Sequence, residues 1–153
     1  MEIKSPNKPV GKLSKKLEKR YSILEKLSVE LNKHEIPKDL AEELNSEIDK
    51  LNSISDSAKE KPRKMMQAIN RIFKKVQKEM GLVPKNYHRN IWMGIGMAAF
   101  GVPMGVSFGL SLDNMAFLGI GLPIGLAIGL AVGGGMDKKA SKEGKQLDID
   151  YEI

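Results

Sequence analysis

Few side chains in this sequence have the chemistry of a catalytic or metal site. The chain has no cysteine, and neither of its two histidines, His34 and His88, has a second ligand at metal-binding spacing. The sequence holds no nucleophile–base pair, phosphate-binding loop or HExxH-type motif. We therefore expect no catalytic residue, no metal and no cofactor, and we predict that the chain is not an enzyme.

Glycine is the residue whose spacing is informative. In two apolar stretches it recurs every fourth residue, which places it on one face of a helix and lets a second backbone approach closely. The helix-packing glycines predicted from this spacing are Gly101, Gly105 and Gly109 in the first stretch, and Gly121, Gly125, Gly129 and Gly133 in the second.

Both apolar stretches are long enough to cross a bilayer. Residues 91–112 and 114–136 carry no charge over 22 and 23 residues. A helix of that length measures about 33 Å, against a hydrocarbon core of about 30 Å. Tyr87 and Trp92 provide amphipathic rings of the kind found at a water–lipid interface. The sequence therefore predicts a two-span transmembrane hairpin over residues 91–136, built as a glycine zipper.

The distribution of charge predicts the topology of this hairpin. Lys85 and Arg89 precede the first span, and four lysines follow the second, whereas the connecting turn carries only Asp113. Positive residues collect on the cytosolic side of membrane proteins. Both termini are therefore expected in the cytosol, and the lipid bilayer is the first predicted partner.

The two spans repeat one another. Residues 101–110 align with residues 121–130, and five of the ten positions are identical. If the chain folds back at Asp113, residues whose numbers sum to 226 lie at equal depth, so Gly101 is level with Gly125. Pro103 and Pro123 then lie about 15 Å from the turn, near the bilayer midplane. We predict a kink at each proline, either as a tolerated defect or as a hinge.

The sequence of the first half of the chain predicts helices that lie outside the membrane. Residues 1–12 contain Pro6, Pro9 and Gly11 and are expected to form a flexible tail. Leucines at three- and four-residue spacing then predict a coiled-coil-like helical hairpin over residues 13–55, capped at Ser14 and interrupted at Pro37.

A basic amphipathic helix is predicted over residues 62–80. Its apolar stripe can pack on the preceding hairpin, or the helix can lie on an anionic membrane surface. The membrane-surface residues predicted for the second case are Arg63, Lys64, Arg71, Lys74, Lys75 and Lys78. Nucleic-acid binding is disfavoured because aromatic residues are sparse there and no recognition motif appears.

Residues 137–153 are predicted to form a cytosolic tail. The alternation of apolar and acidic residues from Leu147 onward raises the alternative that this segment adds as a strand to the sheet of a partner. A solvated tail is the simpler interpretation.

The apolar repeats also carry a resemblance. Ile95-Gly-Met-Ala-Ala-Phe-Gly-Val-Pro-Met-Gly105 and Gly119-Ile-Gly-Leu-Pro-Ile-Gly125, followed by Met136-Asp-Lys-Lys139, resemble a group of small bacterial glycine-zipper membrane proteins with two spans. The resemblance covers about the last 60 residues. It implies a bacterial inner (plasma) membrane setting and assigns no activity.

The sequence thus predicts an all-α membrane protein that presents a cytosolic helical module for a cytosolic protein partner or for self-association through the glycine zippers. An alternative is a self-assembling pore or holin-like permeabiliser. A weaker alternative is a small-solute or ion transporter that uses the midplane prolines. No side chain within the spans provides an intramembrane charge or a selectivity ring for either alternative.

Overall fold

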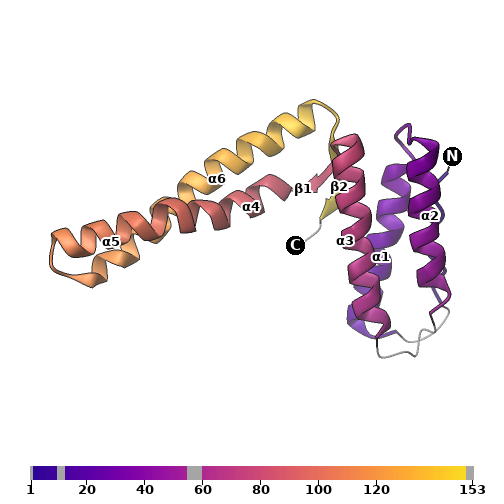
Figure 1. Cartoon of the computed structure of the whole chain (residues 1–153), viewed down its shortest axis with the longest axis horizontal. Helices are drawn as coiled ribbons and strands as arrows, with labels where there is room; N and C mark the ends of the chain where they lie inside the picture. Colours follow the sequence, from indigo (N-terminus) through magenta and orange to yellow (C-terminus); the bar gives the residue numbers. More distant parts are fainter. Residues whose placement is uncertain (1, 10–12, 55–59, 151–153) are drawn as a thin grey trace. The chain divides into compact units, whose positions relative to one another are not determined.

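The computed structural model describes residues 2–9, 13–54 and 60–150, and most of these residues are helical. The chain divides into two compact units (Figure 1). The N-terminal unit comprises Met1–Val83 with Leu147–Ile149, and the C-terminal unit comprises Pro84–Gln146 with the residues from Asp150 onward. Each unit is described by itself below.

The N-terminal unit contains the helices α1 (Lys15–Leu31), α2 (Lys38–Asn52) and α3 (Lys61–Met80). Their boundaries follow local signals in the sequence. Ser14 caps α1 by accepting a hydrogen bond from the backbone N–H of Leu17, as predicted. Pro37 immediately precedes α2, and α3 ends at Gly81, whose φ of 67° is left-handed.

The core of this unit is the meeting of three apolar stripes. Helix α3 packs against both α1 and α2. The stripe residues that are no more than 4% exposed are Leu17, Leu24, Leu27 and Leu31 from α1, Leu40, Leu44, Ile48 and Leu51 from α2, and Met65, Ile69, Ile72 and Val76 from α3. Burial of each such side chain stabilises the fold by about 1.5–3 kcal/mol.

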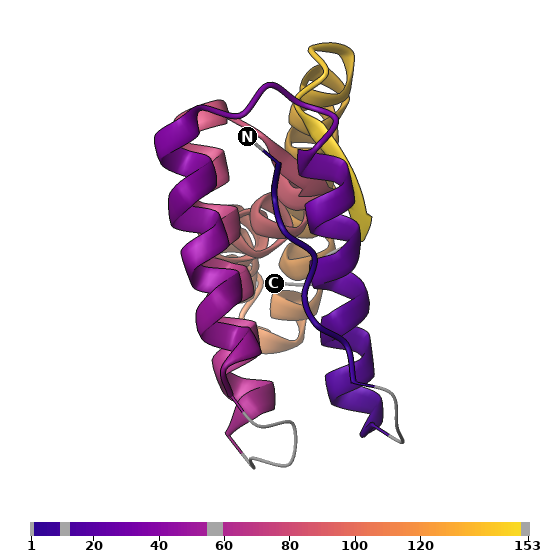
Figure 2. The ribbon, with the colours of Figure 1, turned by 90° about the vertical axis from the view of Figure 1, so that its right-hand side faces the viewer.

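The N-terminal segment corrects two predictions. Residues 2–9 were expected to form part of a flexible tail, and α1 and α2 a coiled-coil-like pair. Instead the segment runs extended between α1 and α2 (Figure 2) and is hydrogen-bonded to side chains of both helices. The helices therefore face the segment on one side and α3 on the other. The part of the predicted tail at residues 10–12 lies outside the described residues.

The C-terminal segment also differs from the predicted tail. Strand β2 (Gln146–Asp150) pairs with β1 (Val83–Lys85) in a two-stranded sheet. Leu147 and Ile149 are 0% and 1% exposed, and they belong to the N-terminal unit. The alternation of apolar and acidic residues therefore reflects a strand within this chain, buried on one face. Residues 151–153 lie outside the described residues.

The C-terminal unit is a helical hairpin. Its first arm is α4 (Tyr87–Gly96), the π-helical turn η1 (Met97–Gly101) and α5 (Val102–Ser111), and its second arm is the 3₁₀ turn η2 (Met115–Phe117) followed by α6 (Leu118–Lys142). Among the described residues these two arms, Tyr87–Ser111 and Met115–Lys142, are long and apolar enough to cross a membrane.

The arms extend further at the base of the hairpin than predicted. The first begins four residues before residue 91, and the second continues six residues beyond residue 136. A Schellman motif ends α6: Lys145 N–H donates to the carbonyl of Ala140 at 2.9 Å, and Gly144 has a φ of 68°. The chain reverses at the tip through Asp113 (φ 49°), and the side chain of Asn114 then caps η2.

Candidate functional site

The two arms of the hairpin meet through glycine backbones. A Cβ placed on Gly121 would lie 2.3 Å from the carbonyl oxygen of Gly101, and one on Gly129 would lie 2.1 Å from the carbonyl oxygen of Trp92. Such distances leave no room for any side chain while the arms keep this separation. All seven predicted packing glycines face the opposite arm or the turn: Gly101, Gly105, Gly109, Gly121, Gly125, Gly129 and Gly133.

The register between the arms is close to the predicted one in the half of the hairpin nearer the tip. Gly121 contacts both Gly101 and Gly105, whereas the prediction placed it level with Gly105 alone. Gly125 likewise lies against both Gly101 and Gly96. Gly121 and Gly125 therefore each sit between two positions of the first arm, about half a turn nearer the base than predicted. The offset exceeds a full turn at Gly129 and Gly133, which contact Trp92 and Arg89.

Gly96 is a packing residue that the four-residue spacing missed. A Cβ on Gly96 would lie 2.3 Å from the carbonyl oxygen of Gly125. Gly96 is five residues before Gly101, and the intervening η1 turn is π-helical, with Val102 N–H donating to the carbonyl of Met97. A π turn holds one extra residue, so a spacing of five keeps both glycines on the same face.

The two predicted kink residues have different surroundings. Pro103 lies in the first turn of α5, immediately after the π turn. Because proline has no N–H, it cannot donate to the carbonyl of Ala99, and the hydrogen-bond ladder widens at this point. The Ser107 hydroxyl donates to the carbonyl of Pro103 at 2.8 Å. Pro123, by contrast, lies inside α6, which continues through it without a change of helix type.

Asp137 joins the arms at the base of the hairpin. One oxygen of its carboxylate accepts from the backbone N–H of His88 at 3.0 Å, and the other accepts from that of Arg89 at 2.9 Å. The side chain is 7% exposed. These amides belong to the first turn of α4, where N–H groups have no partner within the helix, so a carboxylate of α6 caps α4.

The depth rule alone does not locate this cap. Residues 89 and 137 sum to 226, but Arg89 also contacts Gly133, which the rule places level with residue 93. The prediction used the rule for glycines and prolines, and it treated Asp137 as part of a cytosolic tail.

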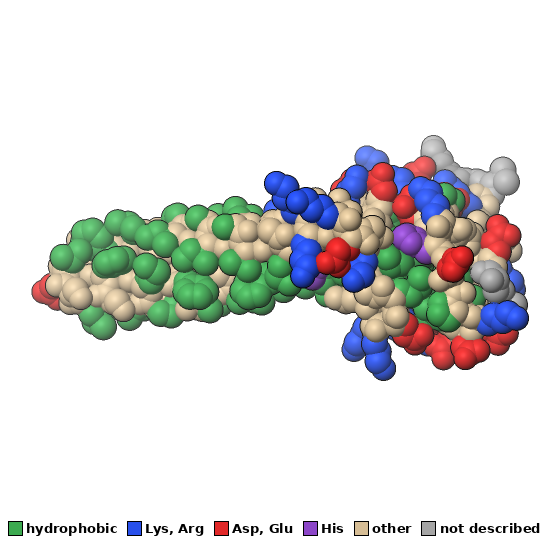
Figure 3. Space-filling model, turned by 90° about the horizontal axis from the view of Figure 1, so that it is seen from above, with side chains coloured by type: hydrophobic (Ala, Val, Ile, Leu, Met, Phe, Trp, Pro, Cys, Tyr) green, Lys and Arg blue, Asp and Glu red, His purple; other side chains and the backbone are tan. Residues whose placement is uncertain are grey.

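The outer surface of the hairpin is apolar. Leu110, Met115 and Leu112 are 68%, 59% and 55% exposed. Hydrophobic side chains cover the hairpin along its length, and basic side chains gather at its base (Figure 3). The other large apolar side chains exposed on this unit are Met93, Ile95, Phe100, Val102, Phe108, Ile120, Leu130, Val132 and Met136. Contiguous exposed apolar surface of this kind is typical of membrane or protein interaction sites.

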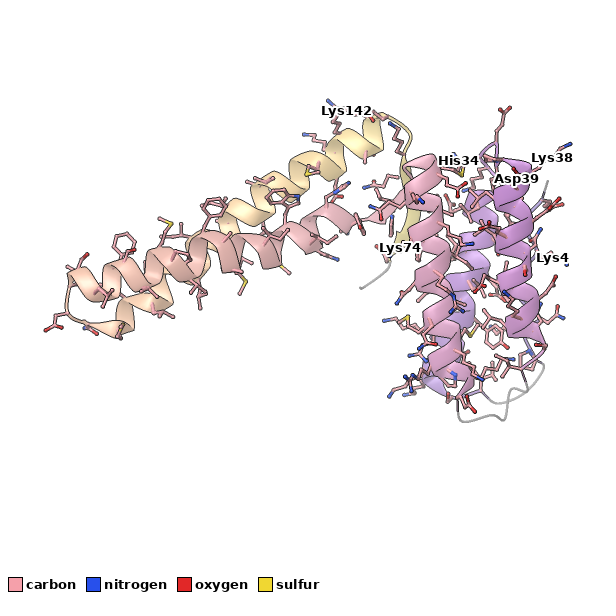
Figure 4. The ribbon with its side chains drawn as sticks, in the orientation of Figure 1. Lys4, His34, Lys38, Asp39, Lys74 and Lys142 are labelled. Carbon is pink, nitrogen blue, oxygen red and sulfur yellow. The ribbon has the colours of Figure 1, made fainter. Side chains whose placement is uncertain are left out.

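Helix α3 packs as in the first of the two alternatives left open for residues 62–80. Its apolar stripe is buried in the N-terminal unit and is not available to insert into a membrane. The six predicted membrane-surface cations lie on the other face, and Lys75 is half-buried while the rest are exposed. Lys74, on the outer face of α3, is labelled in Figure 4.

Ion pairs connect this basic face to α2. Arg71 Nε lies 2.9 Å from a carboxylate oxygen of Glu47, and Lys75 pairs with Glu43. Partial burial opposes ionisation of Glu47, but the hydrogen bond from Lys50 and the charge of Arg71 outweigh it and lower the pKa of Glu47. Some of the predicted surface cations therefore hold α3 on α2.

The N-terminal unit also buries a cation. Lys61 is 2% exposed, and its ammonium donates to the carbonyl of Ile54 at 2.6 Å and lies 5.7 Å from the ring centre of Tyr21. Over the described ranges, no group of three or more His, Cys, Asp or Glu residues could hold a metal ion. His34 lies in the α1–α2 connection (Figure 4), and the His88 ring lies edge-on to Tyr87.

Comparison with protein-family models, curated proteins and solved structures finds no match to this chain.

Proposed function

We propose that this chain is an integral membrane protein of the bacterial inner membrane whose C-terminal unit crosses the bilayer twice and anchors a non-enzymatic N-terminal helical module at the cytosolic face. The observation that carries the proposal is the inside-out character of the hairpin. Its interior is glycine backbone and its exterior is large apolar side chains. In water this exterior would be costly, whereas in lipid it is the expected surface.

The charges at the base and tip support the orientation. Arg89 and four lysines flank the base, and Asp113 is the charged residue of the tip. Tyr87 and Trp92 lie in the first two turns of α4, at the base of the hairpin. Their amphipathic rings are of the kind expected at a water–lipid interface. A base in the cytosol would place both termini there.

Separation of cell membranes at alkaline pH tests the anchoring. We expect the full chain to remain in the membrane pellet under conditions that release peripheral proteins. A chain that is recovered in the soluble fraction would overturn the proposal.

The competing function is a pore, and a depolarisation assay separates the two. An anchor should leave the membrane potential of overexpressing cells unchanged, and in lipid nanodiscs it should have the mass of a monomer or dimer. Depolarisation together with a uniform higher oligomer would favour the permeabiliser and overturn the anchoring role.

A further inference from the structure

The segment at residues 2–9 occupies a groove between α1 and α2 whose walls bind its backbone. The amide side chain of Asn32 accepts from Ile3 N–H at 2.7 Å and donates to the carbonyl of Ile3 at 3.1 Å. Asn45 accepts from Lys4 N–H at 2.8 Å and donates to the carbonyl of Glu2 at 3.1 Å. A side-chain amide can satisfy a backbone donor and acceptor together, as a neighbouring strand would.

Two more side chains continue this recognition. The Ser28 hydroxyl donates to the carbonyl of Lys4 at 2.9 Å, and Asn52 accepts from Asn7 N–H at 3.0 Å. Ser28 and Asn32 come from the α1 side of the groove, and Asn45 and Asn52 from the α2 side. Ser28 and Asn45 are themselves buried. The groove therefore has hydrogen-bonding side chains positioned along the backbone of an extended peptide.

The side chains of the segment give the site its specificity. Ile3 is 3% exposed and Pro6 is also buried, while Glu2, Lys4 and Asn7 point to solvent. The groove thus accepts an extended peptide with an apolar residue followed three positions later by proline. Lys4 reaches α2 at the outer edge of the unit (Figure 4), and its ammonium lies 2.7 Å from a carboxylate oxygen of Asp49.

A second copy of the chain carries the one peptide already seen to fit. All the contacts described run between the segment and the groove, so the same segment from a neighbouring copy would reproduce each of them. If two copies each insert residues 2–9 into the groove of the other, no hydrogen bond is lost. The free-energy cost of this exchange is then the entropy of bringing two chains together. Anchoring in one membrane, as proposed above, lowers that cost by raising the local concentration.

We propose that the α1–α2 groove is an exchangeable peptide site, and that membrane-anchored copies associate by inserting residues 2–9 into one another's grooves. This inference names the partner of the cytosolic module, and its membrane setting rests on the proposed function.

Cross-linking in this cysteine-free chain tests the exchange. One full-length chain carries Lys4→Cys and a second, with a different tag, carries Asp49→Cys; the two are co-expressed and treated with a short bismaleimide. Both wild-type side chains are about half exposed, at 55% and 54%, so the reagent can reach these positions. We expect a covalent dimer that carries both tags, and we expect its loss when Ile3→Asp is added to the Lys4→Cys chain.

Two controls make the result decisive. Lys26→Cys replaces Asp49→Cys at an exposed position of α1 about 200° around the helix from Ser28 and should give no dimer. A single chain with both Lys4→Cys and Asp49→Cys should cross-link within itself, which shows that the pair is reactive. Internal cross-linking without any mixed dimer would overturn the exchange, and so would an equal yield of dimer from the Lys26→Cys control.

The same samples separate this inference from the proposed function. Membrane-pelleted chains that give no mixed dimer would refute the exchange and leave the anchor standing. Soluble chains that give the mixed dimer would refute the anchor and support the exchange.

Discussion

The two units of this protein are packed by opposite means. In the N-terminal unit large apolar side chains point inward, and Leu24, Leu44 and Ile69 are each 0% exposed. In the C-terminal unit the interface between the arms is made of glycine, and side chains such as Leu110 point outward. A fold in water gains stability by burying large side chains, whereas helices in lipid gain it by close backbone contact. This contrast supports the proposal that the hairpin lies in lipid and the N-terminal unit in water.

The largest effect is expected when a large side chain is introduced on the inner face of the hairpin. Gly125→Leu places atoms where the carbonyl of Gly96 lies 2.5 Å from an added Cβ. We expect the arms to separate at a cost of more than about 4 kcal/mol, since a backbone cannot yield as a side chain can. Thermal unfolding of the full chain in detergent measures the loss.

Gly119→Leu is the matched control for this substitution. A Cβ at Gly119 meets nothing within 4 Å, so the new side chain projects outward. Because leucine favours a helix over glycine by up to about 1 kcal/mol, this variant should be neutral or slightly stabilised. Equal destabilisation by the two variants would refute the glycine interface.

Removing a large side chain should harm the N-terminal unit and spare the hairpin. Leu44→Ala leaves a cavity in the three-helix core and should cost about 3 kcal/mol. Hydrogen exchange read by mass spectrometry would show faster exchange in α1–α3 and unchanged exchange in the hairpin. Val29→Ala, at a side chain that is 57% exposed, should change little, and an equal effect there would contradict the account.

A smaller effect is expected at the base of the hairpin. Asp137→Asn keeps the shape of the side chain but leaves one oxygen where two were accepting, so one α4 amide loses its partner. We expect a cost of about 1–2 kcal/mol and faster exchange at the His88 and Arg89 amides. Asp113→Asn at the tip removes the same charge and should leave these amides protected.

The smallest effect concerns pH. The pKa of Glu47 is lowered below its ordinary 4.5, so the folded protein binds fewer protons at this site than the unfolded chain. Its contribution to stability is therefore present above pH 4.5 and is lost as the pH falls through the lowered pKa. Denaturant titrations measure the free energy of unfolding of wild type and Glu47→Gln at each pH. The two free energies should converge in acid, and a difference that stays the same at all pH values would contradict this.

The sequence predicted those elements for which local signals agree. Ser14, Pro37 and Gly81 lie at the ends of α1, α2 and α3, and the fourfold glycine spacing identified residues at the contact between the arms. What it missed depends on contacts between distant residues. The path of residues 2–9 depends on amides at positions 32 and 45, and Gly96 became a packing residue only through the π turn before Pro103.

Labelling of single cysteines in intact spheroplasts tests the central claim most directly. Asp113→Cys marks the tip of the hairpin and Lys145→Cys its base, in a chain with no other cysteine. With a membrane-impermeant maleimide, the account predicts that spheroplasts label Asp113→Cys from outside and label Lys145→Cys only after the membrane is opened. Labelling of both positions from the same side without opening the membrane would contradict a hairpin that crosses the bilayer.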